Sequence, residues 1–178
     1  EDPRPWLAGF SVCPALARYR ILHTGFHSVY LPYRIVRVKQ TSSYFLACLG
    51  GEGRVMLDGR WQAIRPGTAC LLPPHIRIEF KAAGAKAWEF CYVCYSSPTQ
   101  NSPVSSVSSP LLASYDSEPL HCAIAGLEAE CRAAAAPATV HHWIELIQSY
   151  VLRFKHPVAE DHPLHLLWEQ VAGNLSAH

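Results

Sequence analysis

The sequence predicts a compact antiparallel β-barrel or sandwich followed by helices. Three observations support this fold class. Between Tyr44 and Tyr95, short apolar stretches recur at close spacing, and each is cut by Gly or Pro, as in small all-β domains. Residues 96–109 are rich in Ser and Pro and can bury little apolar surface. From Ser117 onward, apolar residues recur at helical spacing.

Composition limits the classes of protein to which the chain can belong. Its 178 residues suffice for one domain with a proper core, and the 16 % of charged residues argue against disorder. The net charge is +1 without a stripe of Lys and Arg, so the chain has no electrostatic footprint for nucleic acid. No apolar run reaches the roughly 18 residues of a membrane span. The acidic, Pro-rich start is unlike a secretory signal. We expect a cytoplasmic protein without a membrane partner.

The seven cysteines agree with that compartment. Cys48, Cys70, Cys91 and Cys94 lie in apolar stretches, where a free thiol behaves as a small buried hydrophobe. Without a secretory signal, we expect them to be reduced core residues. Cys91 and Cys94 have CxxC spacing, but alternation along a strand places their thiols on opposite faces, which argues against a zinc or redox pair.

Turn residues divide the β-rich part of the chain, from about Leu7 to Tyr95, into strands. The glycines at 50, 51 and 53 resemble a phosphate-binding loop, but no Lys-Ser/Thr pair follows and no helix begins there. We interpret them as a turn with a bulge. Asp58-Gly59 and Pro66-Gly67 have the composition of tight turns, and Pro73-Pro74 marks a strand end.

The last part of the chain predicts two or three helices. Ser117 is a candidate cap of the first helix, with Pro119 in its first turn and a stripe formed by Leu120, Ile124, Leu127 and Cys131. Pro137 breaks this pattern, and a second helix runs from about Thr139 to before Pro157. A third begins at Asp161. We therefore divide the chain into a β-barrel over 1–109, with an N-terminal arm and a connector that holds an edge strand at Pro103–Val107, and a helical region over 110–178.

The second helix carries a wide apolar stripe, formed by Trp143, Leu146, Ile147, Tyr150, Val151 and Phe154. Two uses of this stripe are open. It packs on the outside of the barrel, or part of it meets a copy of itself in a two-fold dimer. One helix face can serve both. The candidate dimer contacts are Trp143, Leu146, Ile147, Tyr150 and Phe154.

Metal-dependent chemistry has little support in the sequence. A metal site needs about three or four converging ligands. His75 is the only His between Tyr30 and Tyr95, few carboxylates lie there, and the adjacent His141 and His142 point apart on a helix. No GxSxG motif supports a Ser nucleophile. We expect no metal, no cofactor and no catalytic residue.

Arg37 is the more informative polar residue. Alternation over residues 33–38 places Ile35 and Arg37 on one face of a strand. Arg37 either faces solvent or points inward, where its guanidinium offers a fixed fork of donors. The strand at residues 87–95 places Trp88, Phe90, Tyr92 and Cys94 on one face, either as plain core or as a pocket wall. One Arg beside an aromatic wall is typical of a site for a sugar or similar polyol.

These residues resemble a known family. The stretch YFLACLGGEGRVMLDGRWQAIRPGTACLLPPHIRIEF, followed by WEFCYV, is similar to the cupin-type N-terminal effector domain of AraC-family transcription regulators. The spaced G-x-G, the PG turn, the PP pair and the aromatic-rich strand match in order and spacing. The closing LLWEQVAGNLS resembles the helix that leads to the family's DNA-binding domain. The resemblance implies a cupin-like barrel that binds a small-molecule effector, forms a homodimer and contacts DNA only through a C-terminal helix-turn-helix domain absent from this chain.

The resemblance also implies the ligand-binding residues. In the arabinose-responsive member, the sugar lies inside the barrel under an N-terminal arm. By alignment, the arm contact falls on Pro5, beside Trp6, and the sugar-binding Arg falls on Arg37. The remaining implied contacts are Thr24, Phe80, Phe90 and Tyr92, with Trp88 on the same wall. Phe80 and Phe90 replace hydrogen-bonding groups, so a related sugar or a less polar effector is open.

Two functions follow as hypotheses. The first is a sensor, in which effector binding changes how two subunits present DNA-binding domains. The second is a metal-independent cupin-like enzyme that acts on a sugar, such as an isomerase. The scarcity of metal ligands and the helical tail favour the sensor.

Overall fold

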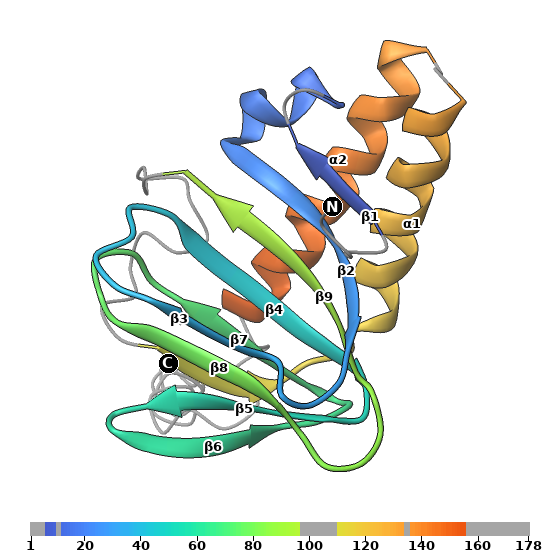
Figure 1. The fold of residues 1–178 in the computed structure, drawn as a ribbon. Helices are drawn as coiled ribbons and strands as arrows, with labels where there is room; N and C mark the ends of the chain where they lie inside the picture. The colour runs from blue at the N-terminus through green and yellow to red at the C-terminus, as the bar shows by residue number, and fades with distance from the viewer. Residues whose placement is uncertain (1–5, 10–11, 97–109, 134–135, 156–178) are drawn as a thin grey trace, which may run out of the picture.

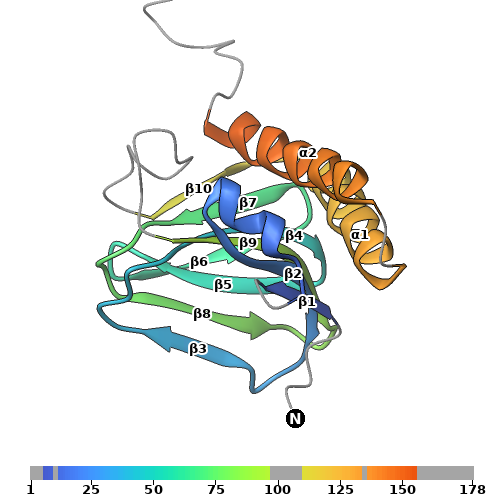
Figure 2. The same cartoon turned by 90° about the horizontal axis from the view of Figure 1, so that it is seen from above.

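The computed structural model describes residues 6–9, 12–96, 110–133 and 136–155. In these ranges the chain forms two facing β-sheets and two α-helices that lie against the larger sheet (Figures 1 and 2). This arrangement confirms the expected fold class, a mainly β, cupin-like two-sheet sandwich followed by helices. The edge strand expected at Pro103–Val107 and the helix expected from Asp161 lie outside the described residues.

Antiparallel pairing builds both sheets. The larger sheet has the order β1 (Trp6–Gly9), β2 (Ile21–Val29), β9 (Trp88–Tyr95), β4 (Ser43–Gly50), β7 (Thr68–Leu72) and β10 (Leu111–Ser114). The smaller sheet has the order β3 (Arg34–Arg37), β8 (Ile78–Ala83), β5 (Glu52–Leu57) and β6 (Arg60–Ile64). Strand β10 follows the Ser/Pro-rich connector and pairs with β7, so the sheet continues past residue 109, where we expected the helical region to begin.

The expected turns are present and have the backbone geometry that their residues favour. Asp58 and Gly59 both have positive φ, at 49° and 76°, which suits the tight hairpin between β5 and β6. Gly67 has φ 87°, and the Thr68 N–H donates to the Arg65 carbonyl across the second turn. Strand β4 also has the expected irregularity, between Cys48 and Gly50.

Alternation along the strands of the larger sheet separates two cores. On β9, Cys91, Val93 and Tyr95 face the helices, whereas Trp88, Phe90, Tyr92 and Cys94 face the smaller sheet. The expectation that Cys91 and Cys94 lie on opposite faces is therefore confirmed. All four cysteines expected in the core are buried, while Cys122 is exposed.

The helices cover the outer face of the larger sheet (Figure 2). Helix α1 (Glu118–Arg132) buries Leu120, Ile124 and Leu127 as its spacing predicts. Ser117 stands at its N-cap position, but its side chain makes no capping bond; instead the Asp116 carboxylate accepts from the Glu118 N–H at 3.2 Å. Helix α2 (Pro137–Lys155) begins at the proline that interrupts the pattern, since proline suits a first helical turn.

A short 3₁₀ helix, η1 (Pro14–Tyr19), was not expected from the sequence. It contributes the fully buried Leu16 to the core on the helix side of the larger sheet. Its last residue also joins η1 to α2, because the Tyr19 hydroxyl donates to Glu145 Oε1 at 2.9 Å.

Candidate functional site

A continuous series of ring contacts crosses the inner face of the larger sheet. It includes Tyr44–His23 at 5.9 Å between centroids, His23–Tyr92 at 5.5 Å, Tyr92–His27 at 5.2 Å and His27–Phe90 at 5.3 Å. It continues through Phe90–Trp88 at 4.3 Å and ends at Phe80 on the smaller sheet, 6.2 Å from Trp88. We call these seven side chains the inner ring series. It is polar at the Tyr44 end and apolar at the Phe80 end.

Arg37 lies at the polar end of this series. It shares the inner face of β3 with Ile35, because these residues pair with Ile78 and Phe80, both buried between the sheets. Its guanidinium carbon lies 5.1 Å from the centroid of the Tyr44 ring, which is within the range of a cation–π contact. The residue as a whole is exposed, since β3 is an edge strand. Arg37 therefore stands at the rim of the packed core between the sheets, which we call the mouth of the barrel, with its charged group against the Tyr44 ring.

The Tyr44 hydroxyl is a neutral donor at this mouth. Burial is the main reason that its pKa is raised well above the usual value, and the nearby Cys94 thiol acts in the same direction. The Arg37 guanidinium and the Ser42 hydroxyl lower that pKa by smaller amounts. Burial likewise raises the pKa of Cys94. Since both groups keep their protons at neutral pH, the mouth combines one permanent positive charge with neutral polar groups.

Two histidines of the inner ring series come from β2. The strand has an irregularity between Ile21 and His23, after which alternate residues face inward. His23 and His27 consequently share one face; four residues of strand separate their backbones by about 13 Å, and both imidazoles contact the Tyr92 ring. The sequence contained this signal, because a spacing of four on a strand keeps two residues on one face. We assigned no ligand role to these histidines or to Tyr44.

The predicted ligand-binding residues fall into three groups. Phe80, Trp88, Phe90 and Tyr92 lie together in the inner ring series, with Arg37 at its polar end, as described above. Thr24 is not brought to them; it lies on the face of β2 that Phe26 shares, toward the helices, and its hydroxyl donates to the Tyr92 carbonyl at 2.7 Å. Pro5 and the side chain of Trp6 lie outside the described residues.

The apolar stripe of α2 is largely used within the chain. Ile147 and Phe154 are buried against the larger sheet. Trp143 is half-buried and packs on α1, where an added Cβ on Gly126 would meet its ring at 2.6 Å. Tyr150 is also half-buried, while Leu146 keeps 40 % of its surface exposed. Packing on the sheet is thus the established use of the stripe, and its outer edge around Leu146 stays available.

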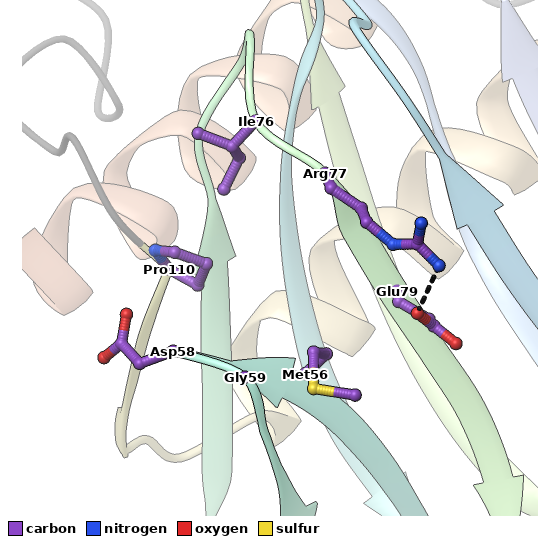
Figure 3. A pocket seen from close by; sticks show the side chains of 7 residues that line it. All are labelled: Met56, Asp58, Gly59, Ile76, Arg77, Glu79 and Pro110. Atoms are coloured by element: carbon purple, nitrogen blue, oxygen red, sulfur yellow. Dashed lines mark hydrogen bonds and ion pairs between the residues drawn. The ribbon is translucent and has the colours of Figure 1, made fainter.

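A separate open pocket of about 540 Å³ lies at one end of the smaller sheet (Figure 3). It is lined by Met56, Asp58, Gly59, Ile76, Arg77, Glu79 and Pro110. Met56 and Glu79 are on the outer face, since their neighbours Val55 and Phe80 face inward. The Glu79 carboxylate is already paired with Arg77, at 3.1 Å, and with Arg34. The charges of Arg77 and Glu79 in this pocket therefore neutralise each other, in contrast to the charge of Arg37.

Two further observations concern the described part of the chain. Among those residues, no group of three or more His, Cys, Asp or Glu side chains is placed to hold a metal ion. Within the same ranges, no helix is long and apolar enough to cross a membrane.

Comparison with known families identifies the strand-rich segment that holds most of these rings. A family model described as the AraC-like ligand binding domain matches residues 42–99. Over these residues the chain is similar to the AraC-like ligand binding domain. The matched segment includes Tyr44, Phe80 and the rings of β9. Arg37, His23 and His27 precede the match, so their placement comes from the structure alone. No curated protein matches the chain.

Solved structures similar to this chain are distant in sequence. One is described as a predicted oxalate decarboxylase from Thermotoga maritima, with 15 % identity, 46 % of this chain and 71 % of that chain covered, and a TM-score of 0.42. Another is the cupin domain of an XRE family transcriptional regulator from Enterobacter cloacae, with 8 % identity, 52 % and 97 % covered, and a TM-score of 0.43. A third is the cupin domain of Cnp3 from Schizosaccharomyces pombe, with 14 % identity, 41 % and 64 % covered, and a TM-score of 0.33.

Proposed function

We propose that this AraC-like domain senses a sugar or sugar-like effector for a transcription regulator. The observation that carries the proposal is the position of Arg37, whose guanidinium lies against Tyr44 at the polar end of the inner ring series. A donor fork for hydroxyl or carboxyl oxygens, beside rings that pack on C–H groups, is what a small polar ligand requires. In this proposal the regulator is cytoplasmic and contacts DNA through a helix-turn-helix domain beyond this chain.

Binding, rather than catalysis, is the function that the inner face supports. A cupin-like enzyme would need a general acid or base within reach of its substrate. Glu79 and Glu89 belong to β8 and β9, but both alternate with inward-facing residues and so lie on outer faces. The alternative of a metal-independent isomerase would have to rely on His23 or His27. Conversion of a bound sugar, followed by NMR, would favour that alternative.

The sensor proposal includes a homodimer formed through α2. Regulators that read paired half-sites need two-fold symmetry. The exposed edge of α2 around Leu146 is the candidate contact, flanked by the half-buried Trp143 and Tyr150.

The effector site and α2 are physically connected through β9. Tyr92 faces the mouth, and three residues later Tyr95 faces the helices, where its hydroxyl donates to Gln148 Oε1 at 2.9 Å. The Tyr115 hydroxyl holds the same helix through the Tyr150 carbonyl at 3.0 Å. A ligand that shifts β9 would therefore act directly on the helix proposed to form the dimer.

A thermal-shift screen against monosaccharides, sugar acids and unrelated metabolites tests the sensor proposal. A ligand present at 100 times its Kd stabilises the folded state by about 2.7 kcal/mol, which is easily measured. Arg37→Ala should remove this stabilisation while the unliganded melting temperature changes little, because the side chain is exposed. A ligand whose effect survives Arg37→Ala would place the effector elsewhere.

A further inference from the structure

The charge on Arg37 has no counterion in the described part of the chain. Arg34, Arg54, Arg65 and Arg77, all near the smaller sheet, each pair with a glutamate. Arg37 instead contacts the face of Tyr44, and no ion pair joins it to a carboxylate within the described ranges. Four guanidinium groups near the smaller sheet are thus neutralised by glutamates, whereas Arg37, like Arg60 on β6, has no carboxylate partner in the described ranges.

The nearest glutamates of the sheets cannot supply that counterion. Glu79 lies one strand away from Arg37, but its carboxylate is on the outer face, bonded to Arg34 Nε at 2.8 Å and Arg77 Nη2 at 3.1 Å. Glu89 on β9 is exposed and near Ser28. The inner side of the mouth therefore favours an anion from outside the described chain.

Neutral polar residues follow Arg37 along the chain. The loop between β3 and β4 contains Gln40, whose two side-chain polar atoms are buried without a hydrogen-bond partner in the described part of the chain. Such an amide is costly to leave unpaired, so a ligand with hydroxyl groups would stabilise it. Ser42 and Tyr44 come next; the Ser42 side chain is a hydrogen-bond partner of the Tyr44 hydroxyl, and the Tyr44 ring is the one that Arg37 contacts.

We propose that the effector of this AraC-like domain is a sugar acid, whose single carboxylate binds Arg37 and whose hydroxylated body lies near Gln40, Ser42 and Tyr44. This inference rests on the sensor function proposed above. A guanidinium binds a carboxylate through two parallel hydrogen bonds. One guanidinium balances one carboxylate, whereas a phosphate group carries a charge of about −1.5 to −2 at neutral pH and would leave part of it unpaired.

Matched pairs of a neutral sugar and its acid test whether the effector is a sugar acid. Galactose and galacturonate, and glucose and glucuronate, differ only at C6, and calorimetry on the whole chain at fixed ionic strength compares them, together with aldonic acids and sugar phosphates. We expect at least one acid to bind about tenfold or more tightly than its neutral counterpart, since a charge-assisted bond is much stronger than a neutral one. A neutral sugar or a sugar phosphate that binds as tightly as the matching acid overturns the inference, and so does a panel in which no acid binds.

Two variants that each remove one positive charge test which arginine contacts the carboxylate of the ligand. Arg37→Gln should weaken binding of the acid about tenfold or more and remove the preference over the neutral sugar. Arg54→Gln, on the outer face of β5, should leave both affinities unchanged. The role of Arg37 is contradicted if both variants lose the same amount of affinity for the acid. It is also contradicted if Arg37→Gln still prefers the acid over the neutral sugar. If Arg37→Gln does not fold, the matched pairs on the wild-type chain still decide the class.

The experiments distinguish a failure of the sugar-acid proposal from a failure of the sensor proposal. A neutral sugar that binds best leaves the sensor function standing and removes only the charge preference. Absence of stabilisation by every small molecule in the broader thermal-shift screen removes both.

Discussion

Gly53 lies where β5 passes closest to the Trp88 side chain. A Cβ added at this position would lie 2.2 Å from Cε2 of the Trp88 ring, and Trp88 is fully buried. We predict that Gly53→Ala lowers the free energy of unfolding by about 1–3 kcal/mol through overpacking. In Gly9→Ala the nearest atom to the new Cβ is 3.8 Å away, so the change should stay within about 0.5 kcal/mol. Urea denaturation measures both, and equal values would contradict the close approach.

Glu79 is the residue whose ionisation should couple most clearly to stability. Its hydrogen bond from Arg34 is the main reason that the pKa of its carboxyl lies below the usual value, with Arg77 contributing in the same direction. A carboxyl whose pKa is depressed by folding stabilises the protein above its unfolded pKa, and this contribution is lost as the pH falls through the folded pKa.

We therefore predict that Glu79→Gln lowers the melting temperature at pH 7, and that the difference from wild type narrows below about pH 4. Thermal denaturation from pH 7 to pH 3 is the measurement. A difference that stays constant over this range would show that the effect comes from packing rather than from charge.

Strand β9 is the element that the sequence predicted most fully. Its alternation alone assigned Trp88, Phe90, Tyr92 and Cys94 to one face, because a central strand with two buried faces has few competing arrangements. Strand β2 was harder, since the irregularity near Leu22 changes which residues face inward, and no residue type marks such a bulge. Arg37 was correctly assigned to the face of Ile35. The contact of its guanidinium with Tyr44 depends on how the two sheets close, which periodicity does not contain.

Two tyrosine hydroxyls hold helix α2 in place, one in a buried and one in an exposed environment. Tyr95 is 1 % exposed and donates to Gln148, whereas Tyr19 is half-buried and donates to the exposed Glu145. We predict that Tyr95→Phe lowers the free energy of unfolding by about 1 kcal/mol. Tyr19→Phe should cost less than about 0.5 kcal/mol, since water can replace its partner. Chemical denaturation compares the two, and a larger loss in Tyr19→Phe would reverse this ranking.

At the scale of the whole molecule, the proposed dimer depends on the outer edge of α2. Leu146→Glu should produce a monomer that still binds effector, because a charge there would face a desolvated partner surface. Ala138→Glu, an equal charge change at an exposed position of the same helix, should leave the dimer intact. Light scattering above micromolar concentration gives the masses.

Two results of the light-scattering measurement would contradict the proposed dimer. A wild-type mass near that of one chain would remove dimerisation from the proposal. A dimer that persists in Leu146→Glu would move the interface away from α2, to another surface such as a sheet edge.

The two faces of β9 have different contacts, and this has a consequence for how such a domain acquires a new effector specificity. Its even-numbered positions from 88 to 94 line the space between the sheets, and the odd-numbered ones from 91 to 95 anchor the helices. If the proposed sensor function holds, mutations at even positions would change effector recognition without changing the surface that contacts the helices. In such a sensor, effector specificity could change independently of the helices, and a laboratory library restricted to positions 90, 92 and 94 would test this while the helices stay docked.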